Sequence, residues 1–496
     1  MVITGSISSE DYQKWESKTL RFEDRMKYAL ADPTFASLPR VCMFSGITKT
    51  DLEFMGAQYP NGPLVYASML SAFKKALLSM KNLRIVRLED IDIDEEVLDA
   101  LVHLPLLKDV RLQSPEIACR EFTPLLEVEE LSVMEWDLRS QYTKQKLELF
   151  SNKRLKGIDI QSYQYASPIL EHLISQGTSA CLTILRITID IHIVPIMMAF
   201  FETCPQLQDI YVTSIPPTFY PVYPSLPPSA LPNLRSYYGI GSLAVLLVPN
   251  RPVKCITIQD NWSSGSHDLE PSWVLSQLSK SSVVIEHLSL PPIQPRPDIF
   301  HEILHTFPKL KSLELRFPLD PNAVQSPPTD NDTTPDDRYF DLTTVNELPP
   351  IEVDEEGCPL EPPTSMKVCS TLRSYPTRLI SLQGLLEWLC TNKLHLSPSI
   401  ANLSILQNSG RTRGINQMFK TCLSFREQYA FAGMLSKHNP TLKSLTYGRQ
   451  HIQWSYGADG KWVPGAEYQF YIKHRNTIPT FSSLPVAVIE GAATTA

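Results

Sequence analysis

The chain has 496 residues, of which 43% are hydrophobic and 20% are charged, and this composition excludes a chain that is disordered throughout. Its 53 acidic side chains outnumber 45 lysines and arginines, so a nucleic-acid partner is not expected, because phosphate binding depends on basic side chains. Nine scattered cysteines without a CxxC pair and a polar N-terminus predict a cytoplasmic or nuclear protein. No apolar run approaches the roughly 20 residues that span a bilayer, so no membrane segment is expected.

Residues 1–60 are expected to form an N-terminal cap region, and a recurring pattern then fills residues 61–317. The pattern is an apolar residue, two variable residues, a second apolar residue, one variable residue and a third apolar residue. Its clearest copies are Leu83/Val86/Leu88, Leu107/Val110/Leu112, Val128/Leu131/Val133, Leu155/Ile158/Ile160, Leu182/Leu185/Ile187 and Leu207/Ile210/Val212. Their starts lie 24, 21, 27, 27 and 25 residues apart, and such regular recurrence is typical of a repeat protein.

Several copies follow a helical pattern that ends at a proline. Residues 96–105 precede Leu107 in this way, and residues 298–308 precede Leu310. Each unit is therefore predicted as a helix, a turn and a short strand. Because one such unit cannot bury its apolar face alone, the predicted fold class is α/β, an irregular leucine-rich-repeat solenoid with a curved parallel sheet and outer helices.

Weaker copies of the pattern continue toward the C-terminus. They are Leu234/Tyr237, Val253/Ile256/Ile258, Ile285/Leu288/Leu290, Leu310/Leu313/Leu315, Ile400/Leu403/Ile405 and Leu442/Leu445/Tyr447. Residues 318–363 contain ten prolines and twelve carboxylates against one arginine, which predicts a disordered acidic insertion. Residues 364–476 are expected to hold C-terminal repeats and a cap, and residues 477–496 a tail.

One motif suggests metal chemistry. His301, Glu302 and His305 form an HExxH, which on a helix places two imidazoles on one face to bind zinc. Here Pro308 ends the helix one turn later and Leu310 opens a repeat strand, which favours an ordinary repeat helix. A zinc enzyme is kept only as a remote alternative, and no metal is predicted.

A second motif suggests nucleotide binding. Gly239, Gly241 and Ala244 fit GxGxxA, with Asp260 placed 21 residues beyond Gly239 as in dinucleotide-binding folds. The strand before it carries charge, and Pro249 stops the following helix after about two turns, so a glycine turn inside a repeat is favoured. A nucleotide enzyme is a remote alternative, no cofactor is predicted, and the chain is not expected to be an enzyme.

Three segments carry a family resemblance. ISSEDYQKWESKTLRFEDRMKYAL at residues 7–30, LPNLRSYYGIGSLAVLLVPNRPVKCITI at 231–258 and WSYGADGKWVP at 454–464 resemble fungal F-box proteins of the mushroom-forming lineage, whose substrate-binding half is a leucine-rich-repeat array. The resemblance implies a substrate-recognition module of an SCF-type ubiquitin ligase. In that family the F-box begins with a leucine-proline pair and a helical bundle before a segment like 7–30. None precedes Ser8 here, so a cullin-ligase adaptor is expected as a partner only if an F-box is supplied upstream.

The variable position between the second and third apolar residues is predicted to face solvent on the concave side of the sheet. The residues at this position are Arg87, Arg111, Ser132, Asp159, Arg186, Tyr211 and Tyr238. Their mixture of charged, hydroxyl and aromatic side chains suits a protein partner better than a phosphate backbone. The predicted function is therefore binding of a protein substrate, and a ligase-independent repeat interaction protein is the alternative.

Overall fold

The computed structural model of the chain divides into two compact units, Met1–Pro252 and Val253–Ala496. The residues that it describes are 9–46, 52–53, 56–57, 59–113, 115–117, 119, 121–135, 147–190, 192–214, 226–259, 271–293, 297–317, 389, 396–407, 425–448 and 452–465. The predicted insertion at 318–363 and tail at 477–496 lie outside these residues. Both units are mixed α/β, with strands that are mostly parallel.

The sheet of the first unit is built from short parallel strands that follow one another in chain order. They are β1 (Val41–Ser45), β2 (Ile85–Glu89), β4 (Asp109–Gln113), β7 (Glu130–Met134), β9 (Gly157–Gln161), β10 (Ile184–Ile189), β11 (Asp209–Ser214) and β12 (Ser236–Gly239). A parallel neighbour requires a crossover connection, and the chain returns after each strand in this way. The prediction of a long, mostly parallel sheet is confirmed.

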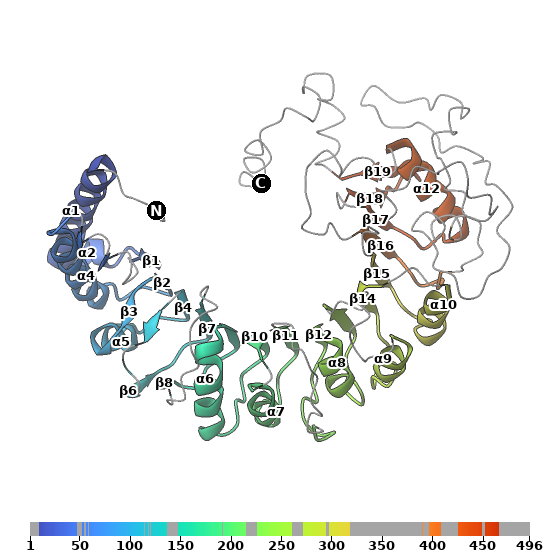
Figure 1. The fold of residues 1–496 in the computed structure, drawn as a ribbon, viewed down its shortest axis with the longest axis horizontal. Helices are drawn as coiled ribbons and strands as arrows, with labels where there is room; N and C mark the ends of the chain where they lie inside the picture. Colours follow the sequence, from blue (N-terminus) through green and yellow to red (C-terminus); the bar gives the residue numbers. More distant parts are fainter. Residues whose placement is uncertain are drawn as a thin grey trace, which may run out of the picture. The chain divides into compact units, whose positions relative to one another are not determined.

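Helices of the first unit lie on one side of its sheet (Figure 1). They are α5 (Glu95–Val102), α6 (Tyr163–Ser175), α7 (Val194–Glu202) and α8 (Gly241–Leu247), while α1 (Ser9–Ala31), α2 (Pro33–Ala36) and α4 (Gly62–Ser79) come before β2. Side-chain caps start three of them: Asp32 accepts a hydrogen bond from the Thr34 amide at 2.9 Å, Asp94 accepts one from the Val97 amide at 3.0 Å, and Ser162 accepts one from the Tyr165 amide at 3.4 Å. The opposite side of the sheet is called the helix-free face below.

The apolar positions of the repeated pattern form the core of the sheet. In the six clearest copies, every one of these side chains is at most 3% exposed. The second and third positions lie on a strand and point toward the helices, because alternate residues of a strand face the same side. The intervening position therefore points to the helix-free face.

At most of the parallel strands, one backbone carbonyl just before the strand accepts hydrogen bonds from two amides at the start of the next strand. The Arg84 carbonyl accepts hydrogen bonds from the Lys108 and Asp109 amides, at 2.8 and 3.0 Å. The same pair of bonds is made by the carbonyls of Lys108, Glu129, Lys156, Thr183, Gln208, Lys254, Glu286, Lys311 and Ala401. This recurrence keeps successive strands in one register.

The uniform helix, turn and strand unit predicted from the sequence is wrong between β4 and β7. The chain there forms β5 (Glu116–Ile117), which pairs with β3 (Asp92–Ile93), and β6 (Glu121–Leu126), which pairs with β8 (Glu148–Phe150). This is the shortest spacing among the six clearest copies, with 21 residues from Leu107 to Val128. It also contains Pro115 and Pro124, which lack the amide that a helix interior needs.

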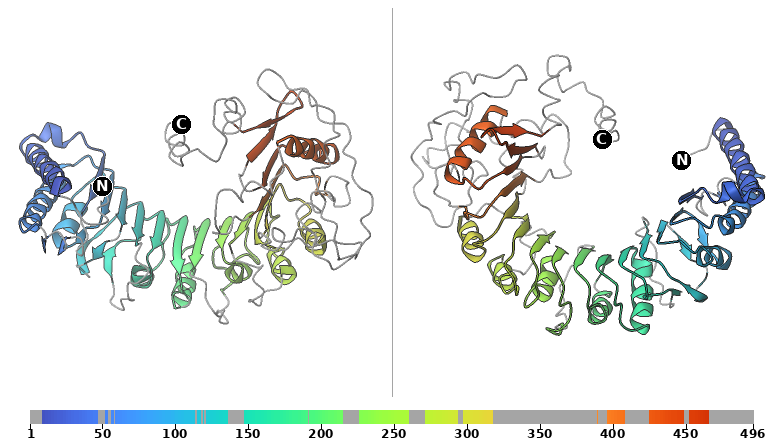
Figure 2. Two further views of the ribbon diagram at one scale, coloured as in Figure 1. Left: turned by 45° about the horizontal axis from the view of Figure 1, so that its top comes forward. Right: turned by 180° about the vertical axis from the view of Figure 1, so that it is seen from behind.

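The second unit contains the parallel strands β13 (Cys255–Ile258), β14 (His287–Pro292), β15 (Ser312–Phe317), β16 (Asn402–Gln407) and β17 (Ser444–Gly448), followed by the antiparallel strands β18 (Ile452–Tyr456) and β19 (Trp462–Pro464). Its helices in the described residues are α9 (Pro271–Leu278), α10 (Pro297–Thr306) and α12 (Phe425–His438). Figure 2 shows the hairpin of β18 and β19 beside α12. Trp454 of this hairpin is fully buried, with its ring 5.8 Å from that of Tyr429.

An ion-pair cluster joins three successive strand entries of the first unit. Glu129 lies 2.8 Å from both Lys108 and Lys156, and these hydrogen bonds lower the pKa of Glu129 to about 2. Because the folded pKa lies below the ordinary value of 4.5, the stabilisation is fully present above about pH 4.5 and is lost as the pH falls toward 2.

Replacing Glu129 by Gln is expected to lower the free energy of unfolding by about 1 kcal/mol at pH 7. Urea unfolding measured at pH 7 and at lower pH should show this difference shrinking as the pH falls. Glu127→Gln is the matched control, because Glu127 is more exposed and pairs with Lys153 at 3.3 Å. An equal loss in both variants, or a loss independent of pH, contradicts the assigned role.

Candidate functional site

The seven residues predicted to bind a partner lie side by side across seven neighbouring strands. The strand register pairs Arg87 with Arg111, Arg111 with Ser132, Ser132 with Asp159, Asp159 with Arg186, Arg186 with Tyr211, and Tyr211 with Tyr238. Strands within a sheet are about 4.8 Å apart, so these side chains form one continuous row. We call this set the column.

Exposure differs along the column. Arg111 and Arg186 are exposed, and Arg87, Asp159, Tyr211 and Tyr238 are half-buried. Ser132 is only 8% exposed, so the expectation that every member faces open solvent is wrong at that position. Its short side chain lies between the longer side chains of Arg111 and Asp159, which explains its burial.

The far end of the column is an aromatic and cationic surface. The Arg186 guanidinium carbon lies 5.0 Å from the centre of the Tyr211 ring, and this ring lies 5.7 Å from that of Tyr238. A guanidinium over an aromatic face is attracted by the ring and is held in place by it. Arg and Tyr bring large contact area and directed hydrogen bonds, which makes this trio the strongest candidate for a partner contact.

Acidic side chains lie beside the column on the helix-free face. Arg111 donates hydrogen bonds to Asp109, at 2.8 Å from Nη2, and this contact raises the pKa of Arg111. Partial burial, together with the neighbouring charge of Asp109, raises the pKa of Glu130. A Cβ atom at Gly157 would stand 1.9 Å from Glu130 Oε2, so glycine is required for the carboxylate to lie there.

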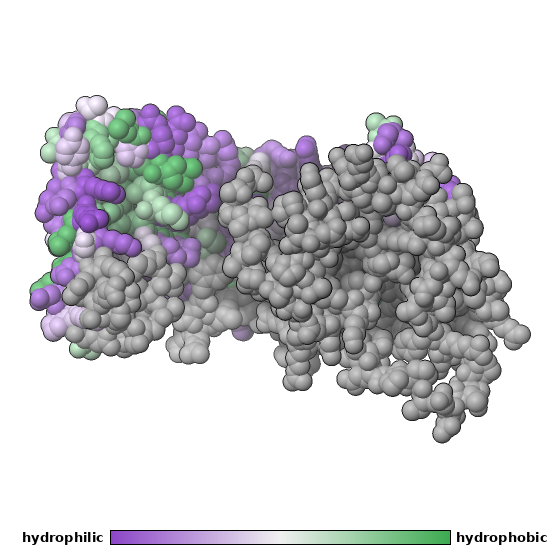
Figure 3. Space-filling model, turned by 90° about the horizontal axis from the view of Figure 1, so that it is seen from above, coloured by the Kyte–Doolittle hydropathy of each residue, from purple (hydrophilic) through white to green (hydrophobic). Residues whose placement is uncertain are grey.

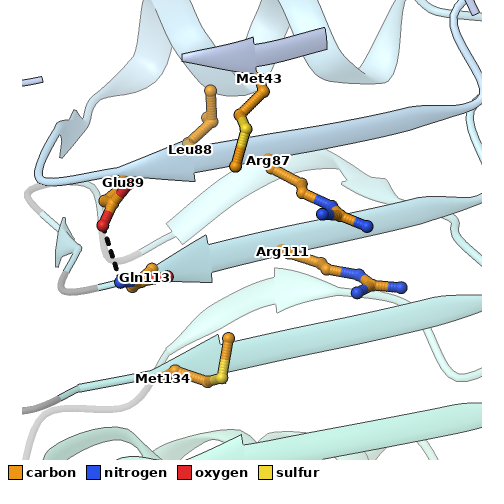
Figure 4. Close-up of a pocket in the computed structure, with 7 residues that line it drawn as sticks. All are labelled: Met43, Arg87, Leu88, Glu89, Arg111, Gln113 and Met134. Carbon is orange, nitrogen blue, oxygen red and sulfur yellow. Dashed lines mark hydrogen bonds between the residues drawn. The ribbon is translucent and has the colours of Figure 1, made fainter. Parts of the chain in front are cut away.

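A shallow hollow of about 110 Å³ lies at the near end of the column. It is lined by Met43, Arg87, Leu88, Glu89, Arg111, Gln113 and Met134. Figure 4 shows the two arginine side chains running parallel and in the same direction, with Glu89 and Gln113 at the other end. Gln113 donates a hydrogen bond to Glu89 at 2.7 Å.

Sequence reasoning missed four polar or methionine residues of this hollow. Met43 on β1 is the register partner of Arg87 on β2, so it extends the row of the column by one strand. Its strand was overlooked because Pro39 stands where the pattern calls for a first apolar residue. Glu89, Gln113 and Met134 each follow a column residue by two positions, so extending the strand alternation by one step would have found them.

The two motifs with possible chemistry lie in ordinary structural settings. His301 and His305 are exposed on α10, and the described residues contain no group of three side chains placed to hold a metal ion. Gly239 ends β12, where a Cβ atom would stand 2.7 Å from the Tyr237 hydroxyl and 2.9 Å from the Val212 carbonyl. Close packing therefore accounts for that glycine, and Asp260 lies outside the described residues.

The comparisons with known proteins give no family assignment, because no protein-family model and no curated protein matches the chain. Among the helices of the described residues, none is both long and apolar enough to cross a membrane.

Proposed function

We propose that the chain is a non-catalytic scaffold of leucine-rich-repeat type that binds a protein on the concave face of its sheet. The observation that carries this proposal is the column, in which seven side chains of consecutive strands form one row on the face that the helices leave free. The Tyr211 ring of the column contacts both Arg186 and the tilted ring of Tyr238, so the three side chains offer a preorganised contact surface.

Two features support the repeat architecture. The apolar positions of the pattern are buried in every clear copy, and the same two-amide hydrogen bond recurs at the strand entries of both units. A structure in which each unit buries its apolar face against the next is the arrangement expected of a repeat protein. The solenoid form belongs to this proposal.

A protein is the favoured class of partner because the charges of the face are mixed. Asp109, Glu130 and Asp159 lie among Arg111 and Arg186. A phosphate backbone would meet these carboxylates and lose the uniform attraction on which its binding depends. Interleaved charges and aromatic rings instead match the composition of protein interfaces.

The finer proposal is that the bound protein is a substrate of an SCF-type ubiquitin ligase, with this chain as its recognition module or as a descendant that works without an F-box. This rests on the resemblance of residues 7–30, 231–258 and 454–464 to fungal F-box repeat proteins. The alternative is a repeat scaffold that binds its partner independently of any ligase.

Affinity purification of the tagged chain from its own cells, followed by mass spectrometry, separates these cases. Co-purification of a cullin and its small adaptor together with a further protein supports the ligase role. Recovery of other proteins alone supports the independent scaffold. If the tagged chain recovers no protein that is absent from an untagged control, the proposed function is contradicted.

A further inference from the structure

The hollow at the near end of the column combines two cations with two thioether side chains. Arg87 and Arg111 stand on neighbouring strands with their guanidinium groups pointing the same way, and Met43 and Met134 lie on the strands to either side (Figure 4). Glu89 is held at the opposite end by Gln113. The hollow therefore has a cationic side and apolar flanks.

Arg87 has no carboxylate two residues earlier on its strand, unlike Arg111 and Arg316. Arg111 pairs with Asp109 and Arg316 pairs with Glu314, in each case two residues earlier on the same strand, at 2.8 and 2.7 Å. Ile85 occupies that position in front of Arg87.

Within the part of the chain that the structure describes, Arg87 makes no ion pair, and its Nε is buried without a hydrogen-bond partner. A buried donor left unpaired costs free energy, so the contacts that Arg87 makes leave part of its hydrogen-bonding capacity unused.

Apolar surface adjoins the hollow. Val41 and Met43 of β1 are 53% and 67% exposed and, being two residues apart on a strand, lie on the same face of the sheet. Figure 3 shows hydrophobic residues gathered over the N-terminal elements and bordered by hydrophilic ones. A ligand that reaches the guanidinium groups would lie next to this apolar surface.

We propose that the hollow receives the carboxylate of an Asp or Glu side chain of a protein partner, with an adjacent aliphatic side chain of that partner packed on Met43 and Val41. A planar carboxylate matches the two-pronged geometry of a guanidinium. A single negative charge is favoured over a phosphate, because Glu89 lines the same hollow and Asp109 already neutralises Arg111. This inference rests on the proposed function and specifies the chemistry of its partner.

The test selects peptides from a random phage-displayed library on the full-length chain. The selected peptides are expected to share an acidic residue next to an aliphatic one. A synthetic copy should bind the Arg87→Met variant about tenfold more weakly than the wild type. Arg84→Met is the matched control, since it removes the same charge from an exposed position at the entry to the same strand and should leave binding unchanged.

A double-mutant cycle between Arg87 and the acidic residue of the peptide shows whether these two side chains contact each other. Changing the acidic residue of the peptide to its amide should weaken binding to the wild type by the same factor, and should cause no further loss on Arg87→Met. An unfolding midpoint of Arg87→Met at or above that of the wild type shows that the loss is not a folding defect.

Other outcomes overturn the inference. Selected peptides that bind the Arg87→Met variant as tightly as the wild type contradict a carboxylate site. A phosphoserine version of the peptide that binds more tightly than the glutamate version also contradicts it, and in both cases the scaffold role stands. Failure to select any peptide from a chain that does capture proteins from its own cells contradicts the inference alone. Failure both to select a peptide and to capture a protein from its own cells contradicts the proposed function as well.

Discussion

Replacing Arg251 by Met is expected to lower the free energy of unfolding of the first unit by about 3 kcal/mol. Arg251 is 3% exposed, and its guanidinium donates hydrogen bonds to six backbone carbonyls. These carbonyls belong to Ala230, Leu246, Leu247, Pro249, Leu226 and Pro227, at 2.9 to 3.5 Å. One side chain thus joins the end of α8 to the segment before β12.

The cost arises because Met cannot pair with these carbonyls and leaves them buried without donors. Burial lowers the pKa of Arg251, which shows that the surroundings already disfavour the charge and that its hydrogen bonds offset this. Urea unfolding followed by circular dichroism measures the loss. Arg235→Met is the matched control, because Arg235 is exposed, and a change within about 0.5 kcal/mol is expected there. A loss of similar size in both variants contradicts the role given to Arg251.

The second large effect concerns binding. Tyr211→Ala is expected to weaken the affinity for a captured protein partner by about 2 kcal/mol, or roughly thirtyfold, because an interface aromatic residue held in place on both sides carries a large share of binding energy. Arg186 lies on one side of the Tyr211 ring and Tyr238 on the other. Surface plasmon resonance with the purified partner gives the affinity. Glu171→Ala, on the exposed side of α6, is the control and should bind as the wild type does.

Arg186→Ala tests whether the trio acts as one surface. If Arg186 and Tyr211 position each other, the double variant should lose less affinity than the two single losses added together. Full additivity would mean that the two residues contact the partner independently. Unchanged affinity in both single variants would contradict the assignment of this end of the column to the interface.

The strands of the array and the burial of their apolar residues could be predicted from the sequence, because strand side chains alternate strictly and the pattern repeats at nearly constant spacing. The same alternation placed Arg87 and Tyr238 in one row. Ser132 departs from its expected exposure because its neighbours are longer, and this depends on packing between strands. The extended segment between β4 and β7 departs from the helical expectation because it contains Pro115 and Pro124, which lack the amide that a helix interior needs.

Other features had no signal in a single sequence. Six partners of Arg251 are backbone carbonyls, which every residue has, so its burial could not be inferred from side-chain types. The hollow brings together residues of four strands, and Met43 belongs to a strand whose first apolar position is occupied by Pro39. Such sites depend on the register between strands, which becomes visible only in three dimensions.

The central claim is that a protein binds at the column, and site-specific photo-crosslinking tests it most directly. A photo-reactive phenylalanine analogue at Asp159, in the middle of the column, should cross-link the full-length chain to a partner protein in its own cells. The same analogue at Glu171, on the exposed side of α6, should not capture that partner. A partner captured from Glu171 and not from Asp159 would place the interface on the helices and contradict the proposed function of the column.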